Sequence, residues 1–164
     1  MRPTEILTEH LKLLLQTAEQ TLASVEAMSP ADRAQVSPVW LARVKASPSA
    51  DPWVHGFAVV LRVGGTVVGS CGYKGPPDAH EVVEIAYGVE PAHQGLGYAT
   101  EVARALVAFA FGSGRVRMVC AHTLPEAGAS PRVLTKSGFE RVGNVVHPED
   151  GLVWRWEVRV TGAT

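Results

Sequence analysis

The segment Tyr87–Glu101, which reads Tyr-Gly-Val-Glu-Pro-Ala-His-Gln-Gly-Leu-Gly-Tyr-Ala-Thr-Glu, contains the change of pattern that decides the fold. It follows a β-rich run and precedes a long helical period, so it joins the end of a strand to the start of a helix. Glycine lets the backbone turn sharply and lets a ligand approach its amides. The first amides of a helix lack internal partners, and with the helix dipole they form a site suited to a pyrophosphate.

Three alternatives compete with that interpretation of the segment. A P-loop requires Gly-Lys-Ser/Thr, and the segment contains no lysine. A Rossmann turn requires a third Gly or Ala, but Gly95 and Gly97 are followed at that spacing by Thr100, and no acidic residue ends the next predicted strand. The third alternative is a strand-to-helix turn with no ligand, and the spacing alone does not exclude it.

Outward from this segment, the chain alternates strand and helix patterns. Gly64-Gly65 joins two β-rich runs and predicts a hairpin. Thr17 and Gln20 form a capping box, and the pairs Ser29-Pro30 and Ser37-Pro38 predict two further helix starts. The predicted strands are Leu11–Leu15, His55–Val63, Thr66–Tyr73, Glu81–Val89, Val116–Ala121, Phe139–Val146 and Leu152–Val160, the last two flanking a turn at Pro148–Gly151.

Two later helices complete the pattern. One spans roughly Gly97–Phe111, and the other begins at Ser130-Pro131, with Ser130 as N-cap, and closes at Gly138. A hairpin-rich front and a βαβ back predict the α/β (α+β) class, with one mixed sheet and helices on both its faces. The length of 164 residues fits a single domain, 1–164.

Composition excludes several function classes. Hydrophobic residues make up 46% and charged residues 19%, which is typical of a globular protein. The formal net charge of −1 gives no electrostatic footprint for nucleic acid or an anionic membrane, and no apolar run approaches the length of a membrane span. Cys71 and Cys120 lie in apolar runs without metal-site spacing, so we expect buried free thiols, no metal and a cytoplasmic location. The first ten residues lack the order of a signal peptide.

Two motifs carry a family resemblance. Gln94, Gly97 and Ala99 fill the pattern Gln/Arg-x-x-Gly-x-Gly/Ala, which resembles the acetyl-CoA signature of the GNAT superfamily of N-acetyltransferases. The longer run to Glu101 is similar to the branch of ribosomal-protein N-terminal acetyltransferases, the RimJ/RimL type. The segment Ala129–Phe139 is similar to the Ala-Ser-x-Arg-Val-Leu-x-Lys-x-Gly-Phe of that branch. The motifs stand in the expected order, and the resemblance covers the chain from about Leu11 onward.

The resemblance implies a GNAT fold with a mostly antiparallel sheet and a cosubstrate. The sheet would splay between its fourth and fifth strands, here Glu81–Val89 and Arg115–His122, and acetyl-CoA would sit in the splay. The pantetheine would pair with the fourth strand near Tyr87 and Val89 as an added strand does. The pyrophosphate would meet the backbone amides of Gln94, Gly95, Leu96, Gly97, Tyr98, Ala99 and Thr100.

Glu84 is the first catalytic candidate. Strand alternation places it on one face with Val82 and Ala86, and a carboxylate on a central strand is costly unless it is hydrogen-bonded or faces a cleft. This position therefore predicts that Glu84 acts as a base toward the acceptor amine, directly or through water. The alternative is a strand-end residue that reaches solvent.

Ser130 is the second catalytic candidate. In the resembled branch a serine here protonates the departing thiolate, although Ser before Pro is also typical of a plain N-cap. Two departures from the family pattern accompany it: Leu134 replaces a tyrosine that many members use as the acid, and Ala127 replaces a common asparagine.

Other polar and aromatic residues have weaker claims to a role. His122 ends the predicted fifth strand and could face the cleft, while His55, His80 and Glu81 could line the acceptor side; a surface or satisfied position is the default for each. Trp40 and Trp53 flank the segment where relatives bind acceptors, with packing as their default role.

These motifs predict an acyltransferase. The predicted reaction is direct attack of a primary amine, either a protein N-terminus or a small molecule, on bound acetyl-CoA, without a metal or a covalent cysteine intermediate. The sequence leaves the oligomeric state open, although exposed sheet edges make homodimers common. A non-catalytic acyl-CoA-binding regulatory module is the alternative, and a nicotinamide-binding fold is disfavoured by the glycine spacing.

Overall fold

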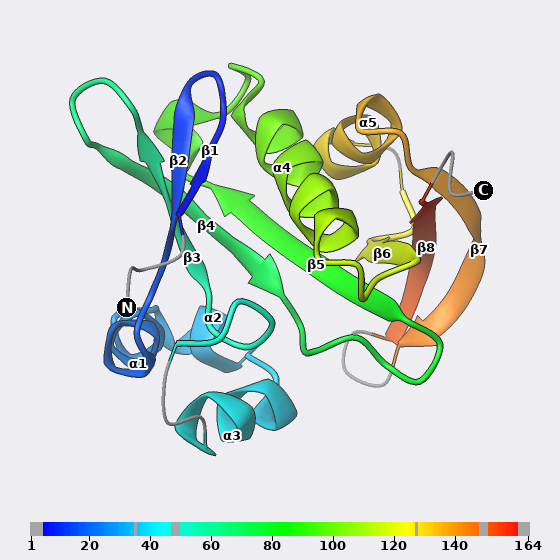
Figure 1. The fold of residues 1–164 in the computed structure, drawn as a ribbon, viewed down its shortest axis with the longest axis horizontal. Helices are drawn as coiled ribbons and strands as arrows, with labels where there is room; N and C mark the ends of the chain where they lie inside the picture. The colour runs from blue at the N-terminus through cyan, green and yellow to red at the C-terminus, as the bar shows by residue number, and fades with distance from the viewer. Residues whose placement is uncertain (1–4, 35, 47–49, 127, 148–150, 161–164) are drawn as a thin grey trace.

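A computed structural model describes residues 5–34, 36–46, 50–126, 128–147 and 151–160. Within these residues eight strands form one sheet in the order β1-β2-β3-β4-β5-β6-β8-β7 (Figure 1). All neighbouring pairs are antiparallel except β5 and β6, which confirms the mixed, mostly antiparallel sheet. The strands are β1 (Glu5–Leu7), β2 (Leu11–Leu15), β3 (Phe57–Leu61), β4 (Val67–Tyr73), β5 (Val82–Val89), β6 (Met118–Thr123), β7 (Glu140–His147) and β8 (Gly151–Arg159).

The helices divide into two groups. α4 lies across the sheet over β5 with α5 beside it, while the first three helices gather beyond the end of the sheet at which β3 begins (Figure 1). A short 3-10 turn, η1 (Pro91–His93), precedes α4. None of the helices in the described ranges is long and apolar enough to cross a membrane. The helices are α1 (Ala18–Glu26), α2 (Pro30–Ala34), α3 (Pro38–Ala46), α4 (Tyr98–Gly112) and α5 (Ala129–Lys136).

The predicted helix starts in the first group are confirmed by their caps. The Gln20 amide donates to the Thr17 hydroxyl at 3.1 Å, and the Thr17 amide donates to Gln20 Oε1 at 2.9 Å. The Ser29 hydroxyl accepts from the Asp32 amide at the start of α2. The Ser37 hydroxyl likewise caps α3. These contacts satisfy amides that the helices themselves leave unpaired.

The Gly64-Gly65 hairpin is also confirmed, with shorter strands than predicted. Both glycines have positive φ, at 87° and 72°, and the Leu61 amide donates to the Thr66 carbonyl at 2.9 Å, which ends β3 at Leu61. The turn spanning Pro148–Asp150 lies outside the described residues. β1 was not anticipated, because three residues carry no readable alternation.

The apolar side of α4 packs on the sheet. Val102, Ala103 and Leu106 are buried in one cluster with Val83 and Ile85 of β5. Because strand residues alternate, Glu84 faces the opposite side of the sheet from these two neighbours. This alternation places different chemistry on the two faces of the same strand.

The parallel strands β5 and β6 are paired over only the first part of β5. β5 and β6 pair only at Val82–Met118, Val83–Val119 and Glu84–Cys120, after which β5 continues for five residues to Val89. The strands therefore diverge beyond Glu84. This is the predicted splay; because β1 adds a strand at the edge, it falls between the fifth and sixth strands of the chain.

Candidate functional site

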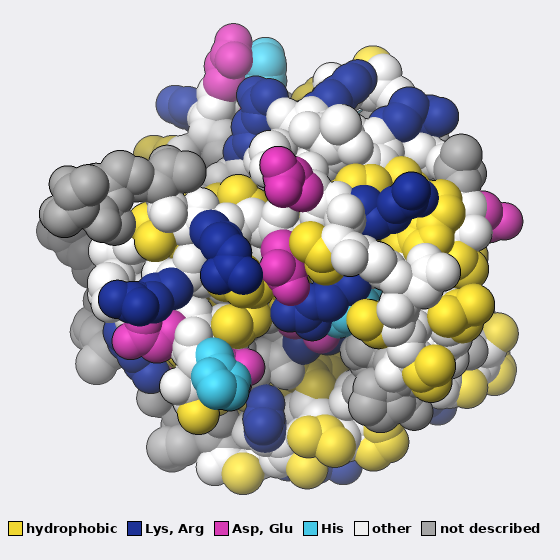
Figure 2. Space-filling model, turned by 90° about the vertical axis from the view of Figure 1, so that its right-hand side faces the viewer, with side chains coloured by type: hydrophobic (Ala, Val, Ile, Leu, Met, Phe, Trp, Pro, Cys, Tyr) yellow, Lys and Arg dark blue, Asp and Glu magenta, His cyan; other side chains and the backbone are white. Residues whose placement is uncertain are grey.

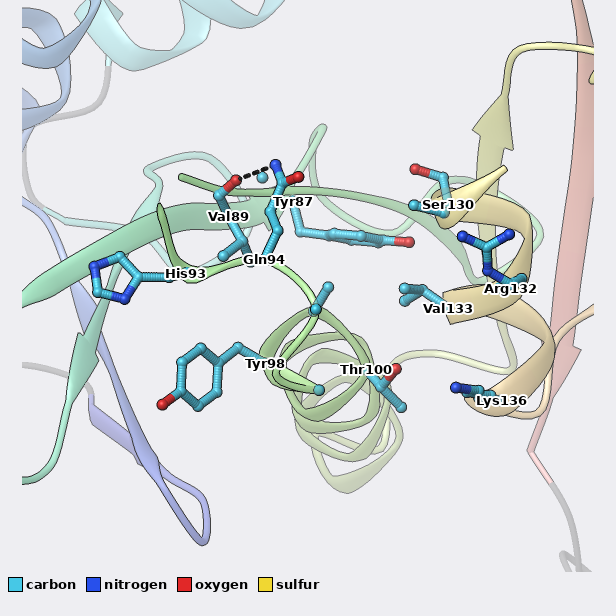
Figure 3. Close-up of a pocket in the computed structure, with 15 residues that line it drawn as sticks. Tyr87, Val89, His93, Gln94, Tyr98, Thr100, Ser130, Arg132, Val133 and Lys136 are labelled. Atoms are coloured by element: carbon cyan, nitrogen blue, oxygen red, sulfur yellow. Dashed lines mark hydrogen bonds between the residues drawn. The ribbon is translucent and has the colours of Figure 1, made fainter. Parts of the chain in front are cut away.

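A pocket of about 360 Å³ lies between the end of β5, the start of α4, and α5. Figure 3 shows the Tyr87 ring extending from β5 toward α5, with Tyr98 and Thr100 below it on α4. The pocket is thus on the α4 side of the splay. Its lining residues are Tyr87, Gly88, Val89, His93, Gln94, Gly95, Gly97, Tyr98, Ala99, Thr100, Ala129, Ser130, Arg132, Val133 and Lys136.

The glycine loop has the geometry of an anion site. Gly95 and Gly97 have φ of 79° and 85°, a region that favours glycine, and Gly97 is the N-cap of α4. A Cβ added at Gly97 would meet nothing within 4 Å, so the backbone is open to a ligand. The Glu101 amide makes the first intrahelical bond, to the Gly97 carbonyl at 3.1 Å, and the preceding amides of the first turn have no acceptor within the helix.

Gln94 shapes this loop through its side chain. Its Nε2 donates to the Val89 carbonyl at 2.8 Å, which ties the loop to the end of β5 (Figure 3). The contribution of Gln94 is therefore a structural bond that fixes where the loop amides lie.

Of the predicted cofactor residues, Leu96 alone does not line the pocket, and this residue is 62% exposed.

Two cations of the pocket were not predicted from the sequence. Arg132 and Lys136 line it from α5, four residues apart on one helix face, and Figure 3 shows the Arg132 guanidinium turned toward the cavity. Both residues lie in the second motif, so their spacing was the available signal. His93 also lines the pocket. These side chains can supplement the loop amides in neutralising phosphate groups.

Ser130 lies in the pocket, but its predicted role as N-cap is wrong. The N-cap of α5 is Gly128, and Ser130 falls inside the first turn. Burial raises the pKa of Tyr87 to about 12, and a hydrogen bond with the Ser130 side chain acts in the opposite direction. Leu134 is buried in the core, as a leucine there should be. Ala127 lies outside the described residues.

Glu84 stands on the other face of the sheet in a cluster of charges. Its Oε2 lies 2.8 Å from His122 Nδ1 and 3.2 Å from Lys74 Nζ. Burial acts to raise the pKa of Glu84, but the hydrogen bonds and charges of His122 and Lys74 outweigh it, so this pKa lies below its ordinary value. Tyr87 and Val89 thus line a pocket on one side of β5 while Glu84 faces the other.

The remaining candidates have structural or surface positions. His55 is fully buried and its Nδ1 accepts the Asp51 amide at 2.7 Å, whereas His80 lies in an exposed turn. Glu81 pairs with exposed Arg117. Trp40 donates to the Val54 carbonyl, and Trp53 packs on Tyr73 and Phe109, which confirms packing as their role in this structure.

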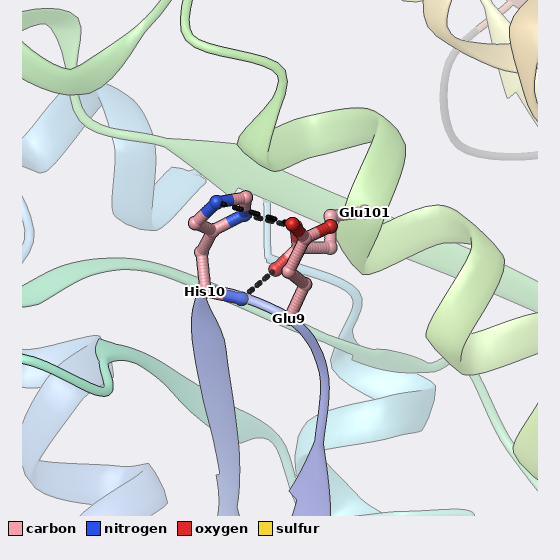
Figure 4. Close-up of side chains that lie close together, drawn as sticks. All are labelled: Glu9, His10 and Glu101. Atoms are coloured by element: carbon pink, nitrogen blue, oxygen red, sulfur yellow. Dashed lines mark hydrogen bonds and ion pairs between the residues drawn. The ribbon is translucent and has the colours of Figure 1, made fainter.

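A second polar cluster joins the turn between β1 and β2 to the first turn of α4. Glu101 accepts hydrogen bonds from the Thr8 hydroxyl and from the His10 amide, and its Oε1 lies 2.9 Å from His10 Nδ1 (Figure 4). Glu9 lies close enough that the three side chains could reach one cation. The bonds between His10 and Glu101 account for their proximity. The cluster anchors the N-terminal hairpin beside the glycine loop.

The chain belongs to the acetyltransferase (GNAT) domain family, whose model matches residues 4–140. An uncharacterized N-acetyltransferase of Bacillus subtilis, YjdG, is 28% identical over 89 residues, which cover 54% of this chain and 51% of that protein. The chain spans about half the length of the curated relatives it matches.

Solved structures share the fold over nearly the whole chain. The ribosomal-protein-S5-alanine acetyltransferase of Vibrio fischeri superposes with a TM-score of 0.72 at 15% identity, covering 98% of this chain and 99% of that one. The aminoglycoside acetyltransferase AAC(6′)-Ib, solved with coenzyme A, gives a TM-score of 0.65 at 20% identity, covering 91% and 94%. At such identities the likeness establishes the fold alone.

Proposed function

We propose that this protein transfers the acetyl group of acetyl-CoA to a primary amine by direct attack in a ternary complex. The observation that carries the proposal is that the two faces of β5 bear different groups. Tyr87 and Val89 line the pocket on one face, whereas Glu84 lies on the other face, at the point where the splay opens. A thioester that entered the gap from the pocket would meet an amine arriving from the side of Glu84. Acyl transfer needs the two reactants held in this relation.

The pocket suits the cosubstrate. The loop amides from Gly95 to Thr100 and the positive end of α4 can hold a pyrophosphate, and Arg132 and Lys136 can supplement them. β5 beyond Glu84 offers an edge to which a pantetheine amide can pair as a strand does. The solved relative bound to coenzyme A supports the same assignment.

We infer that the acceptor is an amine of low pKa. A peptide N-terminus is the first candidate, as in the ribosomal-protein branch. An α-amine has a pKa of about 7.7–8.0 and a lysine side chain about 10.4. At neutral pH the neutral amine therefore costs about 1 kcal/mol in the first case and about 4–5 kcal/mol in the second. The Glu84 cluster offers only a modest proton acceptor, since the hydrogen bonds and charges of His122 and Lys74 hold the pKa of Glu84 below its ordinary value. The smaller cost matches that capacity.

An acceptor screen tests the proposal. Release of coenzyme A from acetyl-CoA is measured with peptide N-termini, lysine side chains, polyamines and aminoglycosides. Release with α-amines supports the proposal, and a clear preference for lysine side chains would contradict the acceptor class. Tight acetyl-CoA binding by calorimetry without release for any amine would favour the alternative, a non-catalytic acyl-CoA-binding module.

We infer that residues 1–164 act as one domain. We also infer a cytoplasmic location, because Cys71 and Cys120 are both free and buried, as suits a reducing compartment. β7 is an edge strand, and Val142, Val146 and Leu152 of the β7–β8 hairpin are more than half exposed. Figure 2, which looks onto that end of the molecule, shows hydrophobic side chains toward its rim around a charged hollow. Light scattering tests the homodimer that this edge favours.

A further inference from the structure

The Glu84 carboxylate is already engaged by two nitrogen groups. One oxygen, Oε2, faces both His122 Nδ1 at 2.8 Å and Lys74 Nζ at 3.2 Å. The Glu84 side chain is 18% exposed and the His122 side chain 8%, so water screens these contacts only in part. A carboxylate held in this way is stabilised as the anion. Such a carboxylate is better suited to orient a neighbouring base, and to stabilise the protonated form of that base, than to accept a proton from an ammonium group itself.

His122 occupies the diverging part of β6. The last pair between β5 and β6 is Glu84–Cys120, and His122 follows two residues later on the same face. Its ring reaches back across the opening to Glu84. The imidazole therefore borders the splay, on the side from which the acceptor would approach.

Other charged groups share this face, and they are engaged elsewhere. Arg155 of β8 stands opposite His122 in the strand register, with its Nε 2.8 Å from Glu157 Oε2. Glu157 stands opposite Cys120. Burial raises the pKa of the Cys120 thiol to about 12, so it stays protonated. The Glu84 carboxylate contacts the His122 ring.

We propose that His122 is the base that removes a proton from the acceptor amine, with Glu84 as the residue that positions it. This assignment rests on the proposed function. With Nδ1–H donating to Glu84, proton exchange takes place at Nε2, and the carboxylate stabilises the imidazolium that forms. In the Ser-His-Asp triad and its variants, a carboxylate bonded to Nδ1–H orients the histidine base in the same way.

The acceptor arrives as an ammonium ion and gives one proton to His122. The nitrogen of the resulting neutral amine then forms a bond to the thioester carbon. The carbon–sulfur bond breaks and its electron pair leaves with sulfur. The second proton lost by nitrogen ends on the coenzyme A thiol, and His122 returns its proton to water.

Turnover of His122→Gln and His122→Ala tests the assignment. With the best α-amine from the screen, we expect kcat to fall by about 5- to 10-fold at neutral pH, the factor by which protonation depletes a neutral amine whose pKa is about 7.7–8.0. Activity should recover toward alkaline pH, where the amine deprotonates unaided, and added imidazole should raise the rate of His122→Ala but not of Glu84→Ala. Acetyl-CoA affinity should stay near the wild-type value, because neither residue lines the cofactor pocket.

The controls separate the inference from the proposed function. His80→Gln, in the exposed turn before β5, should match wild type at every pH, and circular dichroism verifies that each variant folds. Wild-type turnover retained by His122→Gln overturns the inference alone. So does a loss of activity with neither alkaline recovery nor imidazole rescue, which assigns His122 a structural role. Absence of coenzyme A release by the wild type would overturn the proposed function itself.

Discussion

The Nδ1 atom of His10 lies 2.9 Å from Oε1 of Glu101, a bond between the β1–β2 turn and the first turn of α4. The hydrogen bond to Glu101 raises the pKa of His10 above its ordinary value of 6.5. Burial acts to raise the pKa of Glu101, but bonds from Thr8 and His10 bring it below its ordinary value of 4.5. The bond is therefore strongest when His10 is protonated and Glu101 is ionised.

This pair predicts a pH-dependent anchor for the hairpin. The contribution of His10 is fully present below pH 6.5 and is lost as the pH rises through its raised pKa, while that of Glu101 is present above pH 4.5 and is lost as the pH falls through its lowered pKa. We expect the melting temperature of His10→Asn to fall furthest below wild type between those values. The gap should narrow as the pH rises above the raised pKa of His10, whereas a gap independent of pH would contradict the prediction.

Gly97→Val should weaken acetyl-CoA binding by about tenfold or more, equal to about 1.4 kcal/mol. Gly97 has φ +85° at the N-cap of α4, in a loop whose amides face the pocket. Gly114→Val is the matched control, because Gly114 has φ +75° just past the other end of α4. Both variants should lose about 1–2 kcal/mol of stability from the left-handed conformation. Calorimetry should show the loss of acetyl-CoA affinity in Gly97→Val alone. Equal acetyl-CoA affinities of the two variants would contradict a pyrophosphate site at this loop.

Ser130→Ala separates a chemical role from a structural one. Because Gly128 rather than Ser130 caps α5, the melting temperature should change little, instead of showing the loss of about 1 kcal/mol expected for an N-cap. Turnover should fall by about 10²-fold if the hydroxyl protonates the leaving thiolate, with acetyl-CoA affinity nearly unchanged. Thr135→Ala, on the same helix outside this pocket, is the control. A stable Ser130→Ala protein with full turnover would remove Ser130 from the chemistry.

Arg132→Gln and Lys136→Gln should each weaken acetyl-CoA binding by about two- to fivefold, the range of an exposed charge pair. The loss should shrink in about 0.5 M salt, which screens such contacts. Arg141→Gln serves as control, because its guanidinium lies over the Trp154 ring, 4.2 Å from the ring centre, and does not line this pocket. An affinity loss that is equal at low and high salt would argue against a phosphate contact.

Features governed by near neighbours were predictable from the sequence. The Thr17–Gln20 capping box and the Gly64-Gly65 hairpin need only residues a few positions apart, and both appear in the structure. The Ser130-Pro131 pair misled for a local reason too. Proline is tolerated anywhere in a first turn, where amides have no helical acceptor, so the pair did not fix where α5 begins.

Features that join distant segments were not predictable. The turn that joins β1 to β2 is bonded through Thr8 to Glu101, 93 positions away. The contact of Glu84 with His122 spans 38 positions, and it depends on the parallel register of β5 and β6. A single sequence gives the residue types but not that register, so Glu84 was predicted as a base without its two partners.

The divergence of β5 and β6 has a mechanical consequence. Three residue pairs join β5 to β6, whereas five join β4 to β5 and six join β6 to β8, so within the middle of the sheet the pairing is weakest along this line. The two halves of the sheet are therefore held together by fewer backbone bonds there than on either side. A pantetheine paired along β5 would act as a removable splint at this line. The stiffness of the protein would then rise and fall with each round of substrate binding and product release.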